Sequence, residues 1–198
     1  GLPQHVKRQW QRKLDDSQSR TCVATPDTEF GSMHLVEVSR GCPRACRFCA
    51  AGFIYRPFRE HSLDHLRHEI LDEKHDVGRV GLVAAAVSDY GELADIGREI
   101  LDHGGEVSVS SVRIDAITVE QVKVFVDSGH KTLALAPEAG SQQMRDVINK
   151  GIDEEQILAA VIMLAEGGIP NLKLYFMIGL PTESDADIVA IADLTVKI

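Results

Sequence analysis

The sequence predicts an α/β fold with parallel strands, and three observations support this. Apolar runs rich in β-branched residues alternate with helical patterns from Leu35 onward. A glycine-containing turn precedes four of the runs, where a left-handed residue can end a helix and return the chain to a strand. The first run leads directly into a loop with three cysteines. Alternation of strands and helices is typical of βα units, which form parallel sheets.

The expected strands and helices follow one another along the chain. We expect strands at residues 35–38, 79–87, 107–112, 131–136 and 171–178. We expect helices at residues 62–74, 92–102, 119–127, 141–149, 153–165 and 184–196. The intervening glycine turns lie at residues 76–78, 102–105, 127–129 and 166–168. Ser62, Thr118 and Asp153 are typical of helix starts, because their side-chain oxygens accept hydrogen bonds from free backbone amides.

The chain has the size and composition of one globular domain. Of its 198 residues 44% are hydrophobic, and no run approaches the ~20 apolar residues of a membrane span. The N-terminal residues lack an apolar signal segment, so we expect a cytoplasmic rather than a secreted protein. The formal charge of −9 disfavours nonspecific nucleic-acid binding, which requires Lys and Arg to neutralise phosphates. A local basic surface is compatible with this charge.

Residues 1–32 are expected to form a helix followed by a linker, and residues 33–198 the α/β core. The first segment alternates basic and acidic blocks and contains no motif with chemistry of its own. Cys22 lies in this segment, where we favour an incidental thiol over a metal ligand. The chain opens without an initiator Met, so we expect a segment of a longer protein.

Cys42, Cys46 and Cys49 form a C-x3-C-x2-C pattern directly after the first expected strand. Thiolates are soft ligands that bind zinc, Cu(I) or iron–sulfur clusters. Crowded cysteines in a chain of this kind indicate metal binding rather than a disulfide framework. Three ligands instead of four leave one coordination position open, as in a catalytic zinc site. The loop is therefore predicted to hold one metal centre.

With Phe48 before the last cysteine, the loop reads C-x3-C-x-aromatic-C. This pattern resembles the signature of the radical S-adenosylmethionine (radical SAM) enzymes. Residues 40–44, 48–52 and 136–141 are similar to a bacterial subgroup that carries a cobalamin-binding domain before the radical SAM domain. The resemblance extends over residues 33–183. It is specific for the superfamily and says little about the substrate.

The resemblance implies a fold, cofactors and a partner. Radical SAM cores are partial (β/α) barrels of six units, so this chain would be truncated after its fifth strand. The three cysteines would hold a [4Fe-4S] cluster whose open iron binds S-adenosylmethionine. The reduced cluster would cleave this molecule to a 5'-deoxyadenosyl radical, which abstracts hydrogen from an unknown substrate. An electron donor of the flavodoxin or ferredoxin type is also implied, as is cobalamin in a longer protein.

Polar residues stand at the ends of the expected strands, and ligands bind at the carboxyl ends of parallel strands. We expect Arg113 to bind the carboxylate of S-adenosylmethionine, because a guanidinium forms paired hydrogen bonds with carboxylates. An ion pair with Asp115 is the alternative. We expect Glu138 to contact the amine and ribose, with Ser88 and Asp89 as weaker candidates. A helix-capping role is the alternative for Glu138.

Phe48 and the turn that contains Gly179 are expected to contact the adenine, although Gly179 could serve only as a turn. The family's second-strand Gly-Gly-Glu motif is replaced by Ser-Asp-Tyr at residues 88–90. Its fifth-strand motif is matched loosely, at Met177, Gly179 and Glu183. The residues that perform the chemical step are not identified by these motifs.

Strand periodicity adds a substrate hypothesis. Successive strand residues point to opposite faces, so the leucines of residues 171–178 would face the helices and turn Lys173 and Tyr175 inward. A lysine inside a barrel is costly unless it is paired. Lys173 and Tyr175 are therefore candidate substrate contacts, and an ion pair of Lys173 with Glu37 is the alternative.

Two alternative functions stay open at this point. One is an RNA or protein methylthiotransferase, which shares this core but adds a second cluster domain. The other is a non-catalytic iron–sulfur or zinc module, in which Cys22 or a histidine completes the site. His61, His65 and His68 have the spacing of metal ligands on one helix face, but we favour a solvated face.

Overall fold

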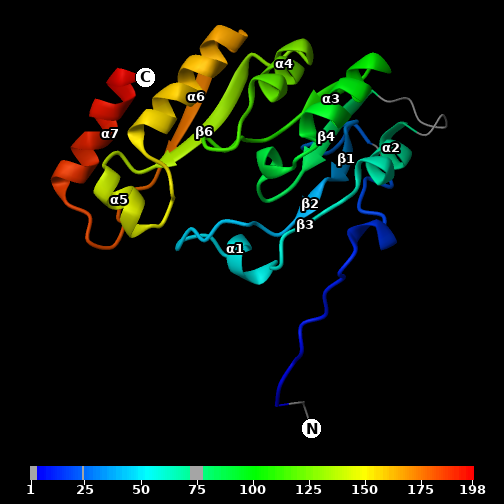
Figure 1. The fold of residues 1–198 in the computed structure, drawn as a ribbon, viewed down its shortest axis with the longest axis horizontal. Coiled ribbons are helices and arrows are strands. Elements are labelled where there is room, and N and C mark those ends of the chain that lie inside the picture. The colour runs from blue at the N-terminus through cyan, green and yellow to red at the C-terminus, as the bar shows by residue number, and fades with distance from the viewer. Residues whose placement is uncertain (1–3, 24, 72–77) are drawn as a thin grey trace.

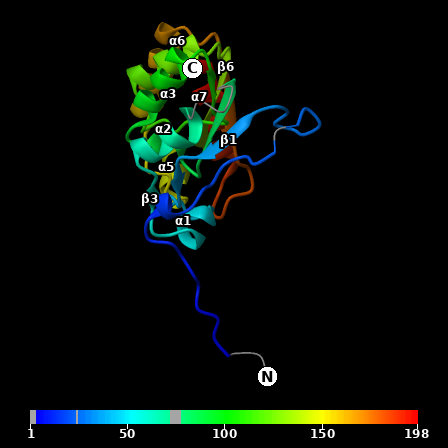
Figure 2. The same ribbon diagram turned by 90° about the vertical axis from the view of Figure 1, so that its right-hand side faces the viewer.

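Parallel strands and the helices between them form the body of the molecule. The structure is a computed structural model that describes residues 4–23, 25–71 and 78–198. Seen from the side, helices lie on one side and strands on the other (Figure 2). The predicted α/β fold with parallel strands is confirmed.

The parallel strands form two groups. The strands are β1 (His34–Glu37), β4 (Arg79–Val83), β5 (Glu106–Ser108), β6 (Thr132–Glu138) and β7 (Asn171–Phe176). In the first group β4 lies between β1 and β5, and in the second β6 pairs with β7. The Val112 amide links the groups by donating to the Ala134 carbonyl oxygen, 3.2 Å away. Within the described residues these strands form no closed barrel.

Helices connect the strands (Figure 1). They are α1 (Ala51–Ile54), α2 (Leu63–Leu71), α3 (Leu93–Asp102), α4 (Val119–Asp127), α5 (Gln142–Val147), α6 (Glu154–Gly167) and α7 (Asp185–Lys197). All three predicted helix starts are confirmed: the Ser62 hydroxyl accepts from the His65 amide at 3.2 Å at the start of α2, Thr118 caps α4, and Asp153 forms a capping box with Gln156 at α6. None of the helices in the described ranges is long and apolar enough to cross a membrane.

Alternate strand residues face the helices and form the core. Val36, Val80, Leu82 and Val107 are each at most 4% exposed and lie in one apolar cluster with side chains of α2 and α3. Burying each such side chain stabilises the fold by ~1.5–3 kcal/mol. The residues between them point to the opposite, open face of the sheet.

Several predicted boundaries are wrong. The strand expected at 79–87 ends at Val83, and the one expected at 107–112 ends at Ser108. In both cases the chain leaves the β-sheet at that residue and forms a loop at the carboxyl end of the strand. The helix expected at 62–74 is seen as α2, while residues 72–77, including most of the turn at 76–78, lie outside the described residues.

The helix expected within residues 1–32 is also wrong. The described part of this segment contains only a 3-10 turn, Leu14–Asp16. Instead, the segment runs along β1, where the Thr21 amide donates to the Leu35 carbonyl oxygen and the Glu37 amide to that of Ser19. It covers the free edge of the sheet, which otherwise exposes unpaired backbone groups.

His61 does not lie on a solvated face. It is 2% exposed, and its Nδ1 lies 3.0 Å from Oδ1 of Asp15, while the His65 ring stacks on it. Burial lowers the pKa of His61, although Asp15 opposes this effect. Burial alone would raise the pKa of Asp15, but hydrogen bonds from Ser62 and His61 outweigh it and lower that pKa. The contact fixes the N-terminal segment to the start of α2.

Candidate functional site

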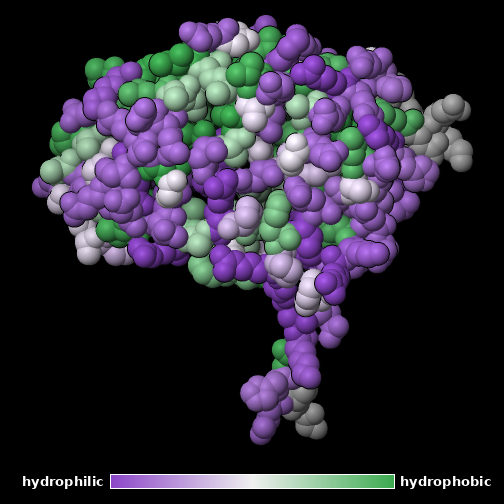
Figure 3. Space-filling model, viewed as in Figure 1, coloured by the Kyte–Doolittle hydropathy of each residue, from purple (hydrophilic) through white to green (hydrophobic). Residues whose placement is uncertain are grey.

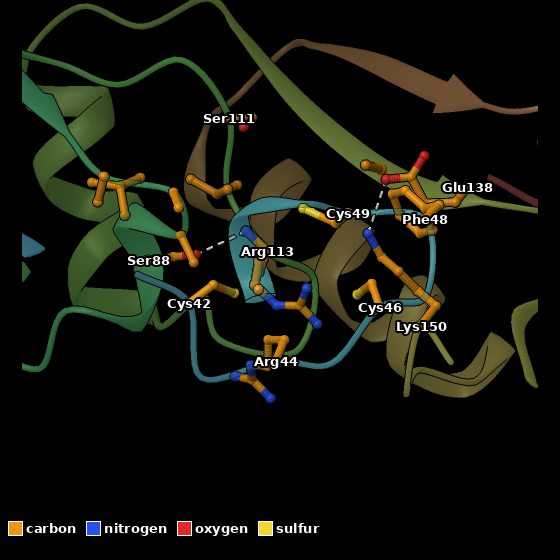
Figure 4. A pocket seen from close by; sticks show the side chains of 17 residues that line it. Cys42, Arg44, Cys46, Phe48, Cys49, Ser88, Ser111, Arg113, Glu138 and Lys150 are labelled. Carbon is orange, nitrogen blue, oxygen red and sulfur yellow. Dashed lines mark hydrogen bonds and ion pairs between the residues drawn. The ribbon is translucent and has the colours of Figure 1, made fainter. Parts of the chain in front are cut away.

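A cavity of ≈ 180 Å³ opens at the carboxyl ends of the strands (Figure 4). The cysteine loop forms one wall, and the loops after β4, β5 and β6 form the others. The polar and thiol side chains in its lining are Cys42, Arg44, Cys46, Cys49, Ser88, Ser111, Arg113, Glu138 and Lys150. Phe48 and a row of small apolar residues complete it.

The cysteine loop starts from a rigid base. β2 (Ser39–Arg40), which precedes the loop, pairs antiparallel with β3 (Arg59–Glu60), which follows it. The two ends of the loop are therefore held side by side. Gly41 adopts a φ of 91°, and a Cβ there would lie 2.6 Å from the Tyr55 carbonyl oxygen. A larger residue at position 41 would therefore require the backbone to move. L residues also rarely adopt such a φ.

The other end of the loop is tied to α5. The Arg47 amide donates to the Ile148 carbonyl oxygen at 2.8 Å, and the Asn149 side chain donates to that of Ala45 at 2.8 Å. The Arg47 guanidinium also donates to the Val147 carbonyl oxygen. A cation at a helix C-terminus is stabilised by the helix dipole. These bonds hold the thiols against the strand ends.

The three thiols face the cavity, and their sulfur atoms do not all lie within 4.8 Å of one another. Cys42 and Cys46 are buried, Cys49 is partly exposed, and the three sulfurs point into the cavity (Figure 4). Zinc–sulfur bonds are ~2.3 Å long, so sulfurs on one zinc ion cannot be much more than ~4.6 Å apart. Among the described residues, the only group of potential ligand atoms within 4.8 Å of one another is that of Asp15, His61 and His65.

This arrangement fits an iron–sulfur cluster better than a zinc ion. A cubane offers a separate iron to each cysteine, so its ligands lie further apart than those of one ion. Cys22 is exposed and is not part of the cavity lining. The donor set therefore consists of three soft ligands on one loop, with open space in front of them.

A network of charges lies beside the thiols. Arg44 pairs with Asp89 and with Asp115, the latter at 2.9 Å. Arg113 donates from Nε and Nη2 to both carboxylate oxygens of Asp115, at 2.9 and 3.0 Å. Burial would lower the pKa of Arg113, but its bonds to Asp115 outweigh burial and raise it. Burial would likewise raise the pKa of Asp115, but Arg113 and Arg44 lower it.

Glu138 and Lys150 form the opposite wall. Lys150 Nζ lies 3.1 Å from Glu138 Oε1 and 6.0 Å from the centre of the Phe48 ring. The register of β6 with β7 shifts between Leu135 and Glu138, and Glu138 has a φ of 69°. A left-handed conformation is strained for a residue other than glycine, and such strain clusters at functional sites. Ser141 rather than Glu138 caps α5.

The structure brings most of the predicted site residues together. The three cysteines, Phe48, Ser88, Arg113 and Glu138 all line the cavity. Ser88 accepts a hydrogen bond from the Arg113 amide at 2.8 Å. Asp89 lies behind the lining, 7% exposed, in its pair with Arg44. Gly179 is outside the lining, where its amide donates to Glu183 at 2.6 Å.

Lys173 and Tyr175 lie elsewhere on the open face of the sheet. Lys173 pairs in register with Ala134 on β6, and this position faces the open side of the sheet. The Lys173 Nζ lies 5.0 Å from the centre of the Tyr175 ring. Tyr175 is 44% exposed. The alternative ion pair of Lys173 with Glu37 is wrong, because Glu37 pairs with Arg40.

Sequence reasoning missed two residues of the cavity, Arg44 and Lys150. Arg44 lies inside the cysteine motif, so its position already indicated proximity to the thiols. Lys150 follows α5 in an Asn-Lys-Gly turn, and its approach to Glu138 depends on how α5 folds back over β6. No local sequence pattern predicts the contact between Lys150 and Glu138.

Comparisons with known proteins agree with this geometry. Residues 36–195 match the family model of the radical SAM superfamily. An uncharacterised protein of Methanocaldococcus jannaschii is 37% identical over 196 residues, which is 98% of this chain and 44% of that protein. The ribosomal protein uS12 methylthiotransferase RimO of Thermosipho africanus is 27% identical over 175 residues, 80% of this chain and 40% of the enzyme. The chain thus spans less than half the length of these relatives.

A solved structure shares the fold. The cobalamin-dependent S-adenosylmethionine radical enzyme OxsB superposes with a TM-score of 0.63 at 19% identity, over 81% of this chain and 26% of OxsB. At this identity the likeness concerns the fold alone. It supports the partial-barrel arrangement of the strands.

Proposed function

Because the chain belongs to the radical SAM superfamily, we propose that it is the core of an enzyme that cleaves S-adenosylmethionine on a [4Fe-4S] cluster. The observation that carries this proposal is the cavity that Cys42, Cys46 and Cys49 line together with Arg113 and Glu138. When bound, the cluster would supply the electron that breaks the sulfonium C–S bond and would thereby generate a radical for hydrogen abstraction.

The chain's own residues bind and orient the ligand in this proposal. Arg113 faces the cavity and uses Nε and Nη2 for Asp115, which leaves the Nη1 N–H groups for a carboxylate. Glu138, held by Lys150, supplies an acceptor for an amine or ribose hydroxyl on the opposite wall. Phe48 presents an apolar ring beside Lys150 for the adenine.

Exclusion of water is the second contribution of the protein. Cys42 and Cys46 are 9% and 6% exposed, and Ser88 at the cavity floor is 3% exposed. A dry site strengthens the electrostatic contacts and protects a reactive species from side reactions. The substrate would approach from the open face of the sheet, where Lys173 and Tyr175 are candidate contacts.

A methylthio group transfer is the second candidate, because RimO is among the relatives. Such an enzyme would need a further cluster domain, which the described residues do not contain. Cobalamin in a longer protein is a related proposal, supported by the fold shared with OxsB.

The experiment is anaerobic reconstitution with iron and sulfide, followed by addition of dithionite and S-adenosylmethionine. Formation of 5'-deoxyadenosine and methionine in equal amounts would support the enzyme. A reconstituted cluster that neither binds nor cleaves S-adenosylmethionine would favour an electron carrier. A colourless protein with one zinc ion would favour a structural module.

A further inference from the structure

A second cavity, of ≈ 240 Å³, lies on the open face of the sheet, and we call it the apolar cavity. Its large apolar side chains come from β1, from β4, from the chain after β5 and from the segment before β1: Phe30, Met33, Leu35, Val83 and Val109. Among the residues that the structure describes, no charged side chain lines it. Ala84 lines both this cavity and that of the cysteines, and Ser110 and Ser111 line one each. The apolar cavity therefore continues the candidate site along the sheet.

Gly81 lies at the base of the apolar cavity. It is in register with Leu35 on β1 and with Ser108 on β5. A Cβ at this position would lie 2.5 Å from Leu35 Cδ2 and 2.6 Å from Met33 Sδ. Leu35 and Met33 can therefore lie across β4 only because residue 81 has no side chain. The apolar base of the cavity is a consequence of this glycine.

Large apolar side chains on the open face are accessible. Phe30 is 51%, Val83 44% and Tyr175 44% exposed. By contrast, hydrophilic side chains predominate on the opposite face, which the helices cover (Figure 3). Exposed apolar side chains that gather around a cavity are typical of a ligand-binding groove. The open face therefore has the composition of a binding surface.

Lys173 adds a positive charge to the same face. It lies opposite Ala134 on β6, whose carbonyl oxygen accepts a hydrogen bond from the Val112 amide. Neighbouring strands are ~4.8 Å apart, which places Lys173 about two strand spacings, ~10 Å, from Val112. The Lys173 ammonium pairs with no carboxylate in the ranges that the structure describes, and lies 5.0 Å from the Tyr175 ring centre. An aromatic face orients a cation without neutralising it, so this charge is available to an anion.

We propose that the substrate is an organic anion with an apolar body, which lies in the apolar cavity and directs its anionic group to Lys173. The apolar body would contact Met33 and Val83, and the reacting carbon would lie near Ala84, where the two cavities meet. Lys173 would select substrates by charge, and Gly81 would provide room for the apolar body. This inference rests on the proposed function and extends it by naming the substrate class.

The chemistry of the open face favours such a molecule over a nucleic acid or a sugar. A phosphate backbone is bound by several cations in succession, whereas Lys173 is the one cation within β6 and β7. A sugar carries many hydroxyl groups, and each costs free energy when it is buried without a hydrogen bond. Within the described residues, the apolar cavity offers only the side-chain hydroxyls of Ser108 and Ser110. One cation beside an apolar cavity matches an amphipathic anion.

The test titrates the chain with two fluorescent probes that share their rings and differ in charge. Anilinonaphthalene sulfonate is an anion, and phenylnaphthylamine lacks the sulfonate. Lys173→Met removes the cation at an exposed position, and Lys131→Met, an exposed lysine before β6, is its matched control. Val83→Asp introduces a charge into the apolar cavity, and Val119→Asp, 63% exposed on α4, is its control. Octanoate and octyl phosphate then compete with the bound sulfonate, which distinguishes a carboxylate from a phosphate as the preferred anion.

We expect Lys173→Met to bind the sulfonate probe about fivefold more weakly, which is the upper end for one exposed ion pair, and to bind the neutral probe as wild type does. Val83→Asp should weaken both probes, because a carboxylate beside an apolar ligand loses hydration. Both control variants should match wild type. Salt should weaken binding of the sulfonate alone, since exposed charges are screened. At least one of the two aliphatic anions should displace the sulfonate.

Wild-type affinity for the sulfonate in Lys173→Met would overturn the proposal, as would an equal loss of both probes, because the lysine would then not select by charge. Unchanged affinities in Val83→Asp would overturn it too. Sedimentation velocity adds a further check: a wild-type dimer that Val83→Asp dissociates would show that a second copy covers this face instead. Failure of the reduced, reconstituted chain to cleave S-adenosylmethionine would count against the proposed function alone, because the probes bind without that reaction.

Discussion

Lys150 holds Glu138 at the wall of the cavity, with Nζ 3.1 Å from Oε1 and side chains 9% and 15% exposed. The two residues come from different elements, the turn after α5 and the end of β6. The strained backbone of Glu138 places its carboxylate where Lys150 can reach it. The pair lines the cavity beside Phe48 of the cysteine loop (Figure 4).

Lys150→Met should weaken S-adenosylmethionine binding about tenfold and lower the free energy of unfolding by ~1–3 kcal/mol, because it leaves a largely buried carboxylate unpaired. Calorimetric titration and urea unfolding measure the two effects. Lys123→Met is the control, since its pair with Asp127 is exposed and should contribute under ~1 kcal/mol. Equal effects of the two substitutions would contradict the role given to Lys150.

Arg113→Lys should reduce S-adenosylmethionine affinity about tenfold while iron content is unchanged. A lysine keeps the charge but loses the planar fork that can serve Asp115 and a ligand together. Equilibrium dialysis with labelled S-adenosylmethionine measures the affinity, and Arg98→Lys, an exposed position, is the control. Wild-type affinity in Arg113→Lys would show that Arg113 serves only in its structural ion pair with Asp115.

The sequence predicted the order of strands and helices because local signals determine it. Thr118 and Asp153 cap helices through residues three positions away, so the pattern is readable in a short window. The cysteine motif placed Phe48 at the cavity for the same reason. These features depend on neighbours in sequence.

Contacts between distant segments account for the errors. His61 has the spacing of an exposed face, but Asp15 from the N-terminal segment covers it. Residues 1–32 were expected to form a helix and a linker, yet Ser19 and Thr21 form hydrogen bonds with β1 along the edge of the sheet. Lys150 meets Glu138 only because α5 folds back over β6. Each depends on tertiary packing, which overrides local propensity.

The stability of the protein should fall as the pH drops from about 7 to 5. The unfolded His61 has a pKa near ~6.5, whereas burial lowers its pKa in the folded protein. In this range the unfolded state therefore binds the proton that the folded state resists, and stability is lost as pH falls. Asp15, with its lowered pKa, adds a further loss at more acidic pH.

Urea unfolding at pH 7 and pH 5 tests this linkage. His61→Gln should show a smaller loss of unfolding free energy between the two pH values than wild type. His68→Gln, on the exposed side of α2, should behave as wild type. An identical pH dependence in His61→Gln would show that another group causes it.

Gly140→Ala should destabilise the fold by ~1–3 kcal/mol. A Cβ at this position would lie 2.2 Å from the Ile191 amide nitrogen, so α7 would have to move. Gly91→Ala is the matched control, because a Cβ there meets nothing within 4 Å. Urea unfolding compares the two, and a neutral Gly140→Ala would mean that α7 does not pack as closely as described.

The most direct test of the central claim is the iron and sulfide content, with the visible spectrum, of the anaerobically reconstituted chain and its cysteine variants. We expect about four iron and four sulfide per wild-type chain and a brown chromophore that Cys22→Ala retains. Replacing Cys42, Cys46 or Cys49 with alanine should abolish it. A chromophore that persists in any of these three variants, or a wild-type chain that binds one zinc and stays colourless, would contradict the account.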